Sequence, residues 1–127
     1  EACGLRATLL FDLAAGEYHT NVVLAVLAGR AVLVSPAGFA EPAVAQAIAG
    51  LYAPHAVLLE RRQQAAFAAN AIALSPRRVW MSAVATASLD PARVQALARA
   101  GFELGQVPLA AIEAGGGSLR CCVAEVF

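Results

Sequence analysis

Two stretches of the sequence recur at the same spacing. NVVLAV begins at Asn21 and NAIALS begins at Asn70, which is 49 positions further along. EPAVAQAIA and DPARVQALA begin at Glu41 and Asp90, and the same 49 positions separate them. Two landmarks that share one offset indicate an internal repeat, with a third copy starting near residue 119. Repeats of about 20–50 residues are typical of stacked or radial arrays, in which each unit buries its apolar face against its neighbours.

Each copy begins with a predicted hairpin. In the first copy, an apolar run over residues 22–27 stops at Ala28 and Gly29 and resumes as RAVLVS. The second copy reads AIAL, then SPRR, then VWMSAVA. Two apolar runs separated by a short turn segment are typical of paired antiparallel strands.

A helix and a closing strand are predicted after each hairpin. Pro42 and Pro91 each follow an acidic residue, and this order is typical of the first turn of a helix. We expect helices over most of 42–52 and 91–99, followed by the strands HAVLLE and FELGQVPL. Each copy is therefore predicted to be a β-β-α-β unit.

The predicted fold class is α/β, with units near residues 19–60 and 69–108 and a final strand over 118–127. Hydrophobic residues make up 60% of the chain and charged residues 14%, whereas typical shares are about 45–50% and about 25%. This balance fits strands that are buried on both faces together with alanine-rich helices. It also fits a piece of a larger protein, and the first residue is Glu1 rather than Met.

Composition argues against nucleic acid and membranes as partners. The formal net charge is zero, so no basic surface is predicted. No run resembles a membrane-spanning helix or a signal peptide. Cys3, Cys121 and Cys122 are an odd number of cysteines, and neighbours on a strand point to opposite faces. We therefore expect reduced thiols, no disulfide framework and a cytoplasmic protein.

A candidate for nucleophilic chemistry lies in GGGSLRCC, near the start of the third copy. Such chemistry needs a thiolate and a partner for proton transfer, and the chain has two histidines. His19 lies two residues before Asn21, and Cys121 lies two residues into the third copy. In a radial array the equivalent strand ends converge, so His19 and Cys121 can meet. Without such a partner, Cys121 is a small buried hydrophobe, and His55, which has no partner signal, is taken as structural.

These end segments, YHTNVVLAV and GGGSLRCCVAEVF, resemble the amidinotransferase and guanidine-modifying superfamily, whose fold is called pentein. The citrulline-utilisation hydrolases have the most similar pattern, and arginine deiminases and dimethylarginine dimethylaminohydrolases are more distant. The resemblance implies an α/β propeller of five β-β-α-β units around a central active site. Residues 1–127 would form the C-terminal portion of that catalytic domain, as a partial ring.

The resemblance also implies roles for single residues. Cys121 corresponds to the nucleophile and His19 to the general acid and base, and neither a metal nor another cofactor is implied. The residues implied beside the substrate are Gly115, Gly116, Gly117, Ser118 and Asn70. Arg120 either binds a substrate carboxylate or points outward from the strand, and Cys122 is expected to pack in the core.

Two functions remain open. The first is a hydrolase or amidinotransferase that acts on the guanidino or ureido carbon of an arginine- or citrulline-like amino acid through a covalent intermediate on Cys121. The alternative is a non-catalytic fragment or binding module on the same fold. In the superfamily, the carboxylates that grip the substrate come mostly from an N-terminal half that this chain lacks. We expect the chain to pair with that half or with another copy in a homo-oligomer.

Overall fold

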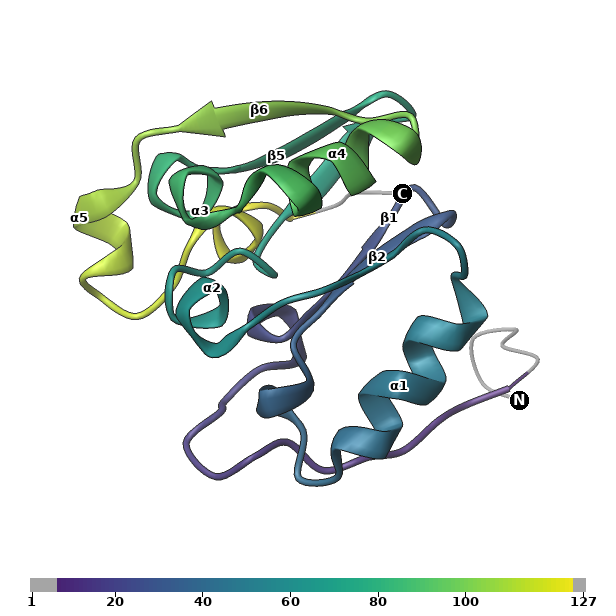
Figure 1. Cartoon of the computed structure of the whole chain (residues 1–127). Coiled ribbons are helices and arrows are strands. Elements are labelled where there is room, and N and C mark those ends of the chain that lie inside the picture. Colours follow the sequence, from purple (N-terminus) through teal and green to yellow (C-terminus); the bar gives the residue numbers. More distant parts are fainter. Residues whose placement is uncertain (1–6, 125–127) are drawn as a thin grey trace.

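The computed structural model describes residues 7–124, which form two three-stranded sheets of the same design (Figure 1). In each sheet the first two strands are antiparallel and the third runs parallel to the middle one. The strands are β1 (Leu24–Leu27), β2 (Ala31–Val34), β3 (Ala56–Leu58), β4 (Ile72–Ser75), β5 (Arg78–Ser82) and β6 (Glu103–Val107). The two predicted hairpins and both closing strands are confirmed.

Two long helices connect the middle strand of each sheet to its third strand. They are α1 (Pro42–Leu51) and α4 (Pro91–Arg99), so the predicted helices are confirmed to within a residue. The shorter elements are η2 (Thr20–Val22), η3 (Pro36–Gly38), α2 (Arg61–Ala65), α3 (Ala83–Ser88), α5 (Ala110–Glu113) and η4 (Leu119–Cys122). In the described part of the chain, no helix is long and apolar enough to cross a membrane.

The hairpin of the first unit turns where the apolar run is interrupted. Ala28 and Gly29 have φ values of 49° and 69°, and the Arg30 N–H donates to the Leu27 carbonyl at 3.1 Å. Two successive residues with positive φ let the chain reverse within the three loop residues 28–30. This turn sets the register that places Leu27 opposite Ala31.

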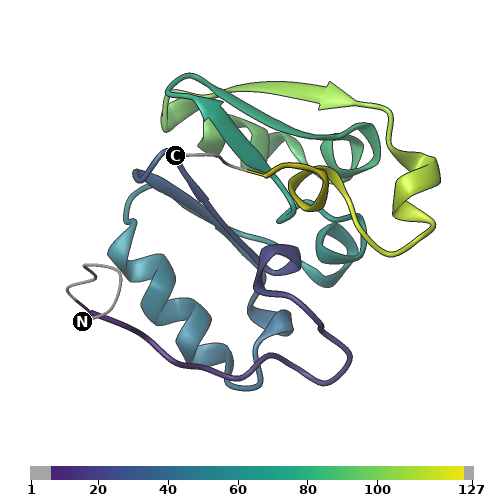
Figure 2. The ribbon, with the colours of Figure 1, turned by 180° about the vertical axis from the view of Figure 1, so that it is seen from behind.

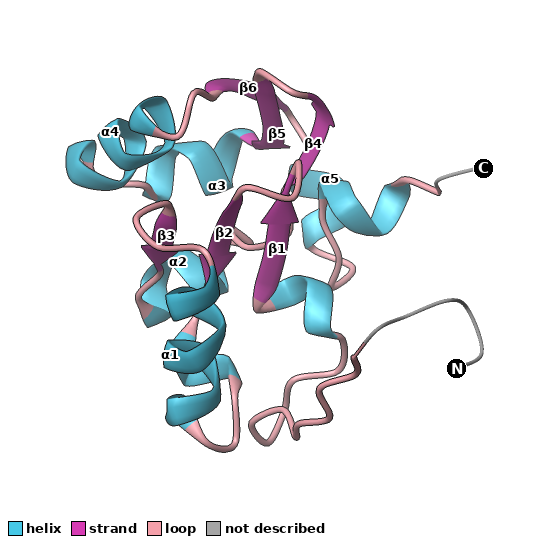
Figure 3. Ribbon diagram, turned by 90° about the vertical axis from the view of Figure 1, so that its right-hand side faces the viewer, coloured by secondary structure: helices cyan, strands magenta, loops and turns pink. Residues whose placement is uncertain are grey.

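The helices and sheets alternate in layers (Figures 1 and 3). Helix α1 covers one face of the first sheet, and α3 and α4 lie between the two sheets. One apolar cluster joins the units and includes Leu33, Met81 and Leu97, all with no exposed surface. A second cluster lies between the first sheet and α1 and includes Val32 and Ile48. Both faces of the first sheet are therefore buried.

The middle strand of the second unit is shorter than predicted. The apolar run VWMSAVA predicts a strand through Ala85, whereas β5 ends at Ser82 and α3 begins at Ala83. The Ser82 hydroxyl accepts a hydrogen bond from the Ala85 N–H at 3.0 Å. Serine is a preferred N-cap, and this cap starts a helix in a segment whose composition alone is compatible with a strand.

The predicted final strand over 118–127 is wrong where the structure describes it. Leu119–Cys122 form the 3-10 helix η4, and Val123 and Ala124 belong to no strand. The Arg120 N–H donates to the Asn70 Oδ1 atom at 2.8 Å, and the Cys121 N–H donates to the Ser118 carbonyl at 3.1 Å. The backbone N–H groups of Arg120 and Cys121 are therefore already bonded, and they are the donors that would pair with a neighbouring strand. Residues 125–127 lie outside the described residues.

Candidate functional site

Cys121 lies in η4, the yellow coil of Figure 2, and its thiol contacts the first residues of the other two copies of the repeat. Cys121 is exposed, in η4. The Asn70 Nδ2 atom donates to Cys121 Sγ at 3.2 Å, and Sγ lies 3.8 Å from Asn21 Oδ1. Asn21 and Asn70 are the first residues of the two sequence copies. The fold therefore brings the starts of the three sequence copies together around a thiol, although the first and third copies begin in 3-10 helices and not in strands.

His19 lies in the segment that leads into η2, and its side chain is exposed. Its ring contacts the ring of Tyr18, with 5.3 Å between the centroids. The Tyr18 hydroxyl donates to the Gly116 carbonyl, so the His19 segment is tied to the glycine loop. In the described residues, no hydrogen bond joins His19 to Cys121, and the catalytic pairing of the two stays a prediction.

Tyr18 is the residue of this site that sequence reasoning missed. Burial raises the pKa of its phenol above the ordinary value of 10.0, and the nearby Cys121 and Glu17 raise it further. The phenol therefore stays protonated at neutral pH and can keep donating to Gly116. The sequence offers one indication that Tyr18 belongs to the site, which is its position next to His19 in YHTN. The partner could not be foreseen, because Gly116 is 98 positions away.

The glycine loop packs directly against the nucleophile candidate. Gly116 has a φ of 92°, a conformation that residues with a side chain rarely adopt. A Cβ atom on Gly117 would lie 3.5 Å from the Cβ and 3.7 Å from the Sγ of Cys121. Ser118 is fully buried, and its hydroxyl donates to Glu113 at 2.8 Å. These contacts shape the loop that carries the thiol.

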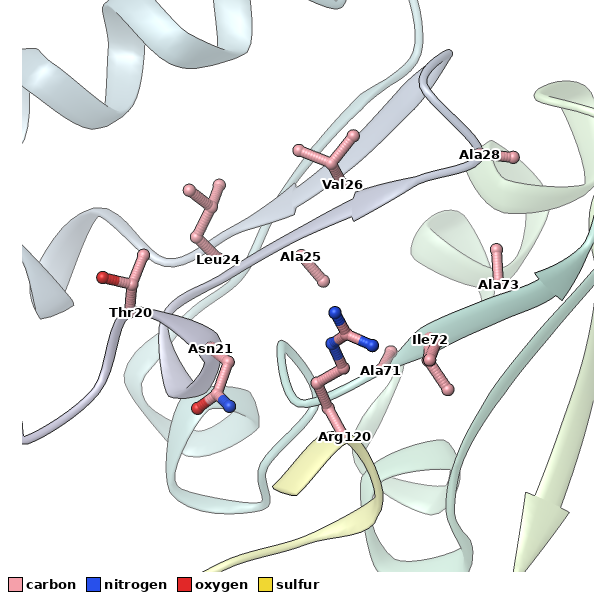
Figure 4. Close-up of a pocket in the computed structure, with 10 residues that line it drawn as sticks. All are labelled: Thr20, Asn21, Leu24, Ala25, Val26, Ala28, Ala71, Ile72, Ala73 and Arg120. Carbon is pink, nitrogen blue, oxygen red and sulfur yellow. The ribbon is translucent and has the colours of Figure 1, made fainter. Parts of the chain in front are cut away.

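Arg120 extends into a pocket of about 420 Å³ between β1 and β4 (Figure 4). Asn21 also lines this pocket, so the pocket adjoins the thiol of Cys121. The remaining walls are small or aliphatic apart from one threonine: Thr20, Leu24, Ala25, Val26, Ala28, Ala71, Ile72 and Ala73. Among the described lining residues, Arg120 is the charged one, and Thr20 and Asn21 are polar.

Cys122 does not pack in the core, so that expectation is wrong. It is exposed, and its thiol donates to the Ser118 carbonyl at 3.4 Å. The reason is that η4 is a 3-10 helix, in which neighbouring residues do not alternate between two faces as they do on a strand. Cys121 and Cys122 are both free thiols, and Cys3 lies outside the described residues. Across residues 7–124, no group of three histidine, cysteine or acidic side chains could hold a metal ion.

Repeated β-β-α-β units that meet at an exposed cysteine define the class of this protein. It belongs to the amidinotransferase, or pentein, superfamily, as the sequence predicts. Within that superfamily, the family model described as N,N dimethylarginine dimethylhydrolase, eukaryotic, matches residues 14–127, and the chain belongs to this family. By sequence pattern alone, the chain resembles the citrulline-utilisation hydrolases more than it resembles this family.

Solved structures share the fold. The N-terminal domain of ArgZ bound to substrate, an arginine dihydrolase from cyanobacteria, is 23% identical with a TM-score of 0.65, and the match covers 81% of this chain and 36% of that one. AgrE with ornithine and NAD+ is 24% identical with a TM-score of 0.67, covering 82% and 14%. The amidinotransferase SxtG from Microseira wollei is 17% identical with a TM-score of 0.58, covering 87% and 32%.

The chain therefore spans about a third of the ArgZ domain and of SxtG. No curated protein sequence matches it significantly. The complete five-unit ring stays a prediction, because the described residues contain two units and the start of a third.

Proposed function

We propose that this chain carries the nucleophile of an enzyme that hydrolyses a guanidino or ureido amino acid or transfers its amidino group. The observation that carries the proposal is the exposed Cys121 thiol with the Asn70 amide donating to it at 3.2 Å. The thiolate is the nucleophilic form of cysteine, and the Asn70 N–H group is aimed at the sulfur that would carry its charge. Membership of a family described by dimethylarginine hydrolysis supports the same chemistry.

In the proposed reaction, Cys121 Sγ forms a bond to the central carbon of the guanidino group. His19 as imidazolium donates a proton to the departing amine, and the C–N bond breaks to leave an amidino group on sulfur. A water molecule then attacks the same carbon while His19 accepts its proton. The S–C bond breaks, and Cys121 leaves as the thiolate that began the cycle. In a transferase, an acceptor amine replaces the water.

Substrate binding is assigned to the two sides of the thiol. Arg120 offers a guanidinium to the carboxylate of an amino acid from the pocket between β1 and β4. Gly116 and Gly117 lack side chains, so the reacting group can approach the backbone closely. ArgZ is described as an arginine dihydrolase bound to substrate, and AgrE is described with ornithine. Both descriptions support a basic amino acid as the ligand class.

A non-catalytic role on the same fold has one observation in its favour. None of the described residues that line the Arg120 pocket is a carboxylate, and a guanidinium or ureido group needs acidic or polar partners to be held. In that case the chain would bind a small acid or a protein partner without turnover.

The test uses the full-length protein that the gene encodes. Amine release is measured with arginine, N,N-dimethylarginine and citrulline, for the wild type, Cys121→Ser and Cys122→Ser. We expect Cys121→Ser to reduce turnover by a factor on the order of 10³ or more, as loss of a nucleophile does, while Cys122→Ser stays active. Mass spectrometry of the quenched wild type should find the amidino group on the peptide that contains Cys121.

Two outcomes would contradict this assignment. An active Cys121→Ser together with an inactive Cys122→Ser would transfer the nucleophile to the neighbouring cysteine. A wild type without turnover on any guanidino or ureido amino acid, and without a covalent adduct, would favour the non-catalytic role.

A further inference from the structure

The side chain of Asn70 has no exposed surface. All of its hydrogen-bond donors and acceptors have partners within the protein. Its Nδ2 atom donates to the Asn21 carbonyl at 3.0 Å and to Cys121 Sγ at 3.2 Å. Its Oδ1 atom accepts from the backbone N–H of Arg120 at 2.8 Å and of Cys121 at 3.4 Å. A primary amide has two N–H donors and two acceptor lone pairs. Asn70 therefore has nothing left to offer a substrate.

The backbone around Asn70 is held as firmly as its side chain. The Asn70 N–H donates to the Phe67 carbonyl at 2.8 Å. Phe67 has a φ of 59° just after α2, in the left-handed position that glycine usually takes at a helix end. Ala69 and Ala71 on either side of Asn70 are buried in the cluster that joins the units. The amide thus projects from a rigid base toward η4.

We propose that Asn70 is a positioning residue for Cys121 and does not contact the substrate. One edge of its amide binds two successive N–H groups of η4, which fixes the turn. Its other edge directs a donor at the sulfur, which orients the sulfur and stabilises the negative charge that sulfur carries when it attacks or leaves. This inference rests on the proposed cysteine chemistry, and it replaces the substrate-binding role that the resemblance implies for Asn70.

Asn70→Asp separates these two actions in the full-length protein. Aspartate has the same shape and keeps an acceptor for the Arg120 and Cys121 N–H groups, but it puts an oxygen where Asn70 donates to the sulfur and to the Asn21 carbonyl. We measure the rates at which iodoacetamide alkylates Cys121 and Cys122, located by peptide mass spectrometry, without substrate. Because a hydrogen bond to a charged group is worth more than a neutral one, we expect the Cys121 to Cys122 rate ratio to fall about 10- to 100-fold.

Cys122 serves as the internal reference, because it lies in the same turn and is also exposed. Gln63→Glu is the matched control, since Gln63 is a fully buried amide that binds Ser88 and Asp90 instead. It should leave the rate ratio unchanged. Asn70→Ala removes the donor without adding charge, and the ratio should fall in this variant as well. Near-ultraviolet circular dichroism checks that each variant is folded.

In turnover, both Asn70 variants should lower kcat and leave KM near that of the wild type. A raised KM with an unchanged rate ratio would show that Asn70 contacts the substrate, and would overturn the proposal. Rates that rise together at both cysteines would show that Asn70 acts only in folding, and would also overturn it. A fall in the ratio in a protein that turns over no substrate would support positioning while refuting the proposed function.

Discussion

The two β-β-α-β units differ in burial at positions that the repeat makes equivalent. Ala25 and Ala31 of the first sheet are 8% and 0% exposed. The residues 49 positions later are Leu74, which is 61% exposed, and the half-buried Trp80. The first pair belongs to the apolar cluster that joins the two units, whereas the second pair lies outside that cluster. Burial in a repeat is thus decided by the neighbouring unit as much as by the strand itself.

The amino-acid pattern of the middle strands follows the same rule. All four residues of β2, AVLV, are buried, because both faces of the first sheet are covered. Strand β5, RVWMS, alternates at its start between exposed and buried residues, because one face of the second sheet is uncovered in the described residues. Continuous apolar runs are typical of strands covered on both sides, and alternation is typical of strands covered on one.

The largest test of this comparison is a pair of leucine truncations. Leu33→Ala leaves a cavity in the cluster between the sheets and should lower the free energy of unfolding by about 2–5 kcal/mol. Leu74→Ala removes an exposed side chain and should change it by less than about 0.5 kcal/mol. Urea denaturation of the full-length protein measures both. Similar losses for the two variants would show that the outer face of the second sheet is covered in solution.

A pair of glycine substitutions tests the packing on the outer face of the second sheet by adding a methyl group to it. A Cβ atom on Gly105 would lie 2.5 Å from the Trp80 ring, so Gly105→Ala should destabilise the protein by about 1–3 kcal/mol. Gly50 of α1 has open space around it, and Gly50→Ala should stabilise by about 0.5–1 kcal/mol. Melting temperatures report both signs. A neutral Gly105→Ala would mean that Trp80 does not rest on β6.

The smallest expected effect comes from the helix starts, Glu41 and Asp90, which are equivalent in the repeat. The Asp90 Oδ1 atom accepts from the Arg93 N–H at 3.0 Å, whereas the Glu41 side chain makes no cap bond among the described residues. Asp90→Ala should therefore lower the melting temperature at pH 7, and Glu41→Ala should leave it nearly unchanged. Equal effects would contradict the difference in capping.

Acid provides an independent check on the same carboxylate. The backbone N–H of Arg93, followed by its side chain, lowers the pKa of Asp90 below the ordinary 3.8. A lowered pKa in the folded state means that the stabilisation is complete well above pH 3.8 and is lost as the pH falls through the folded-state pKa. The difference in melting temperature between wild type and Asp90→Ala should thus shrink as the pH falls below the folded-state pKa of Asp90. A difference that persists there would exclude the charge as its cause.

Much of the fold could be predicted because it rests on local patterns. Pro42 and Pro91 mark the starts of the helices, and Gly29 marks the turn of the first hairpin, each within a few residues of the element it shapes. Helices α3 and η4 could not be predicted in the same way. The Ser82 cap competes with strand propensity in α3, and η4 depends on Asn70, which lies 50 positions from Arg120.

The candidate site was predictable where the repeat itself encodes it. The repeat marks Asn21 and Asn70 as equivalent positions that meet if the units are arranged radially, and Cys121 was singled out by the glycine-rich segment before it and by the family resemblance. The roles of the side chains were not predictable. The Asn70 amide forms hydrogen bonds with backbone groups and with the Cys121 sulfur, and the Tyr18 hydroxyl donates to the Gly116 carbonyl. All of these partners are distant in the sequence. Such docking depends on the three-dimensional arrangement, which no local pattern contains.

The asparagine contacts to the thiol also bear on the time course of folding. Cys121 is 51 positions from Asn70 and 100 from Asn21. Joining such distant points costs chain entropy that grows with their separation, so these contacts are expected to form after the hairpins. A chain that has formed its hairpins but not docked its units has two ordinary cysteines side by side. The moment at which their reactivities diverge would therefore report when the three copies dock around Cys121.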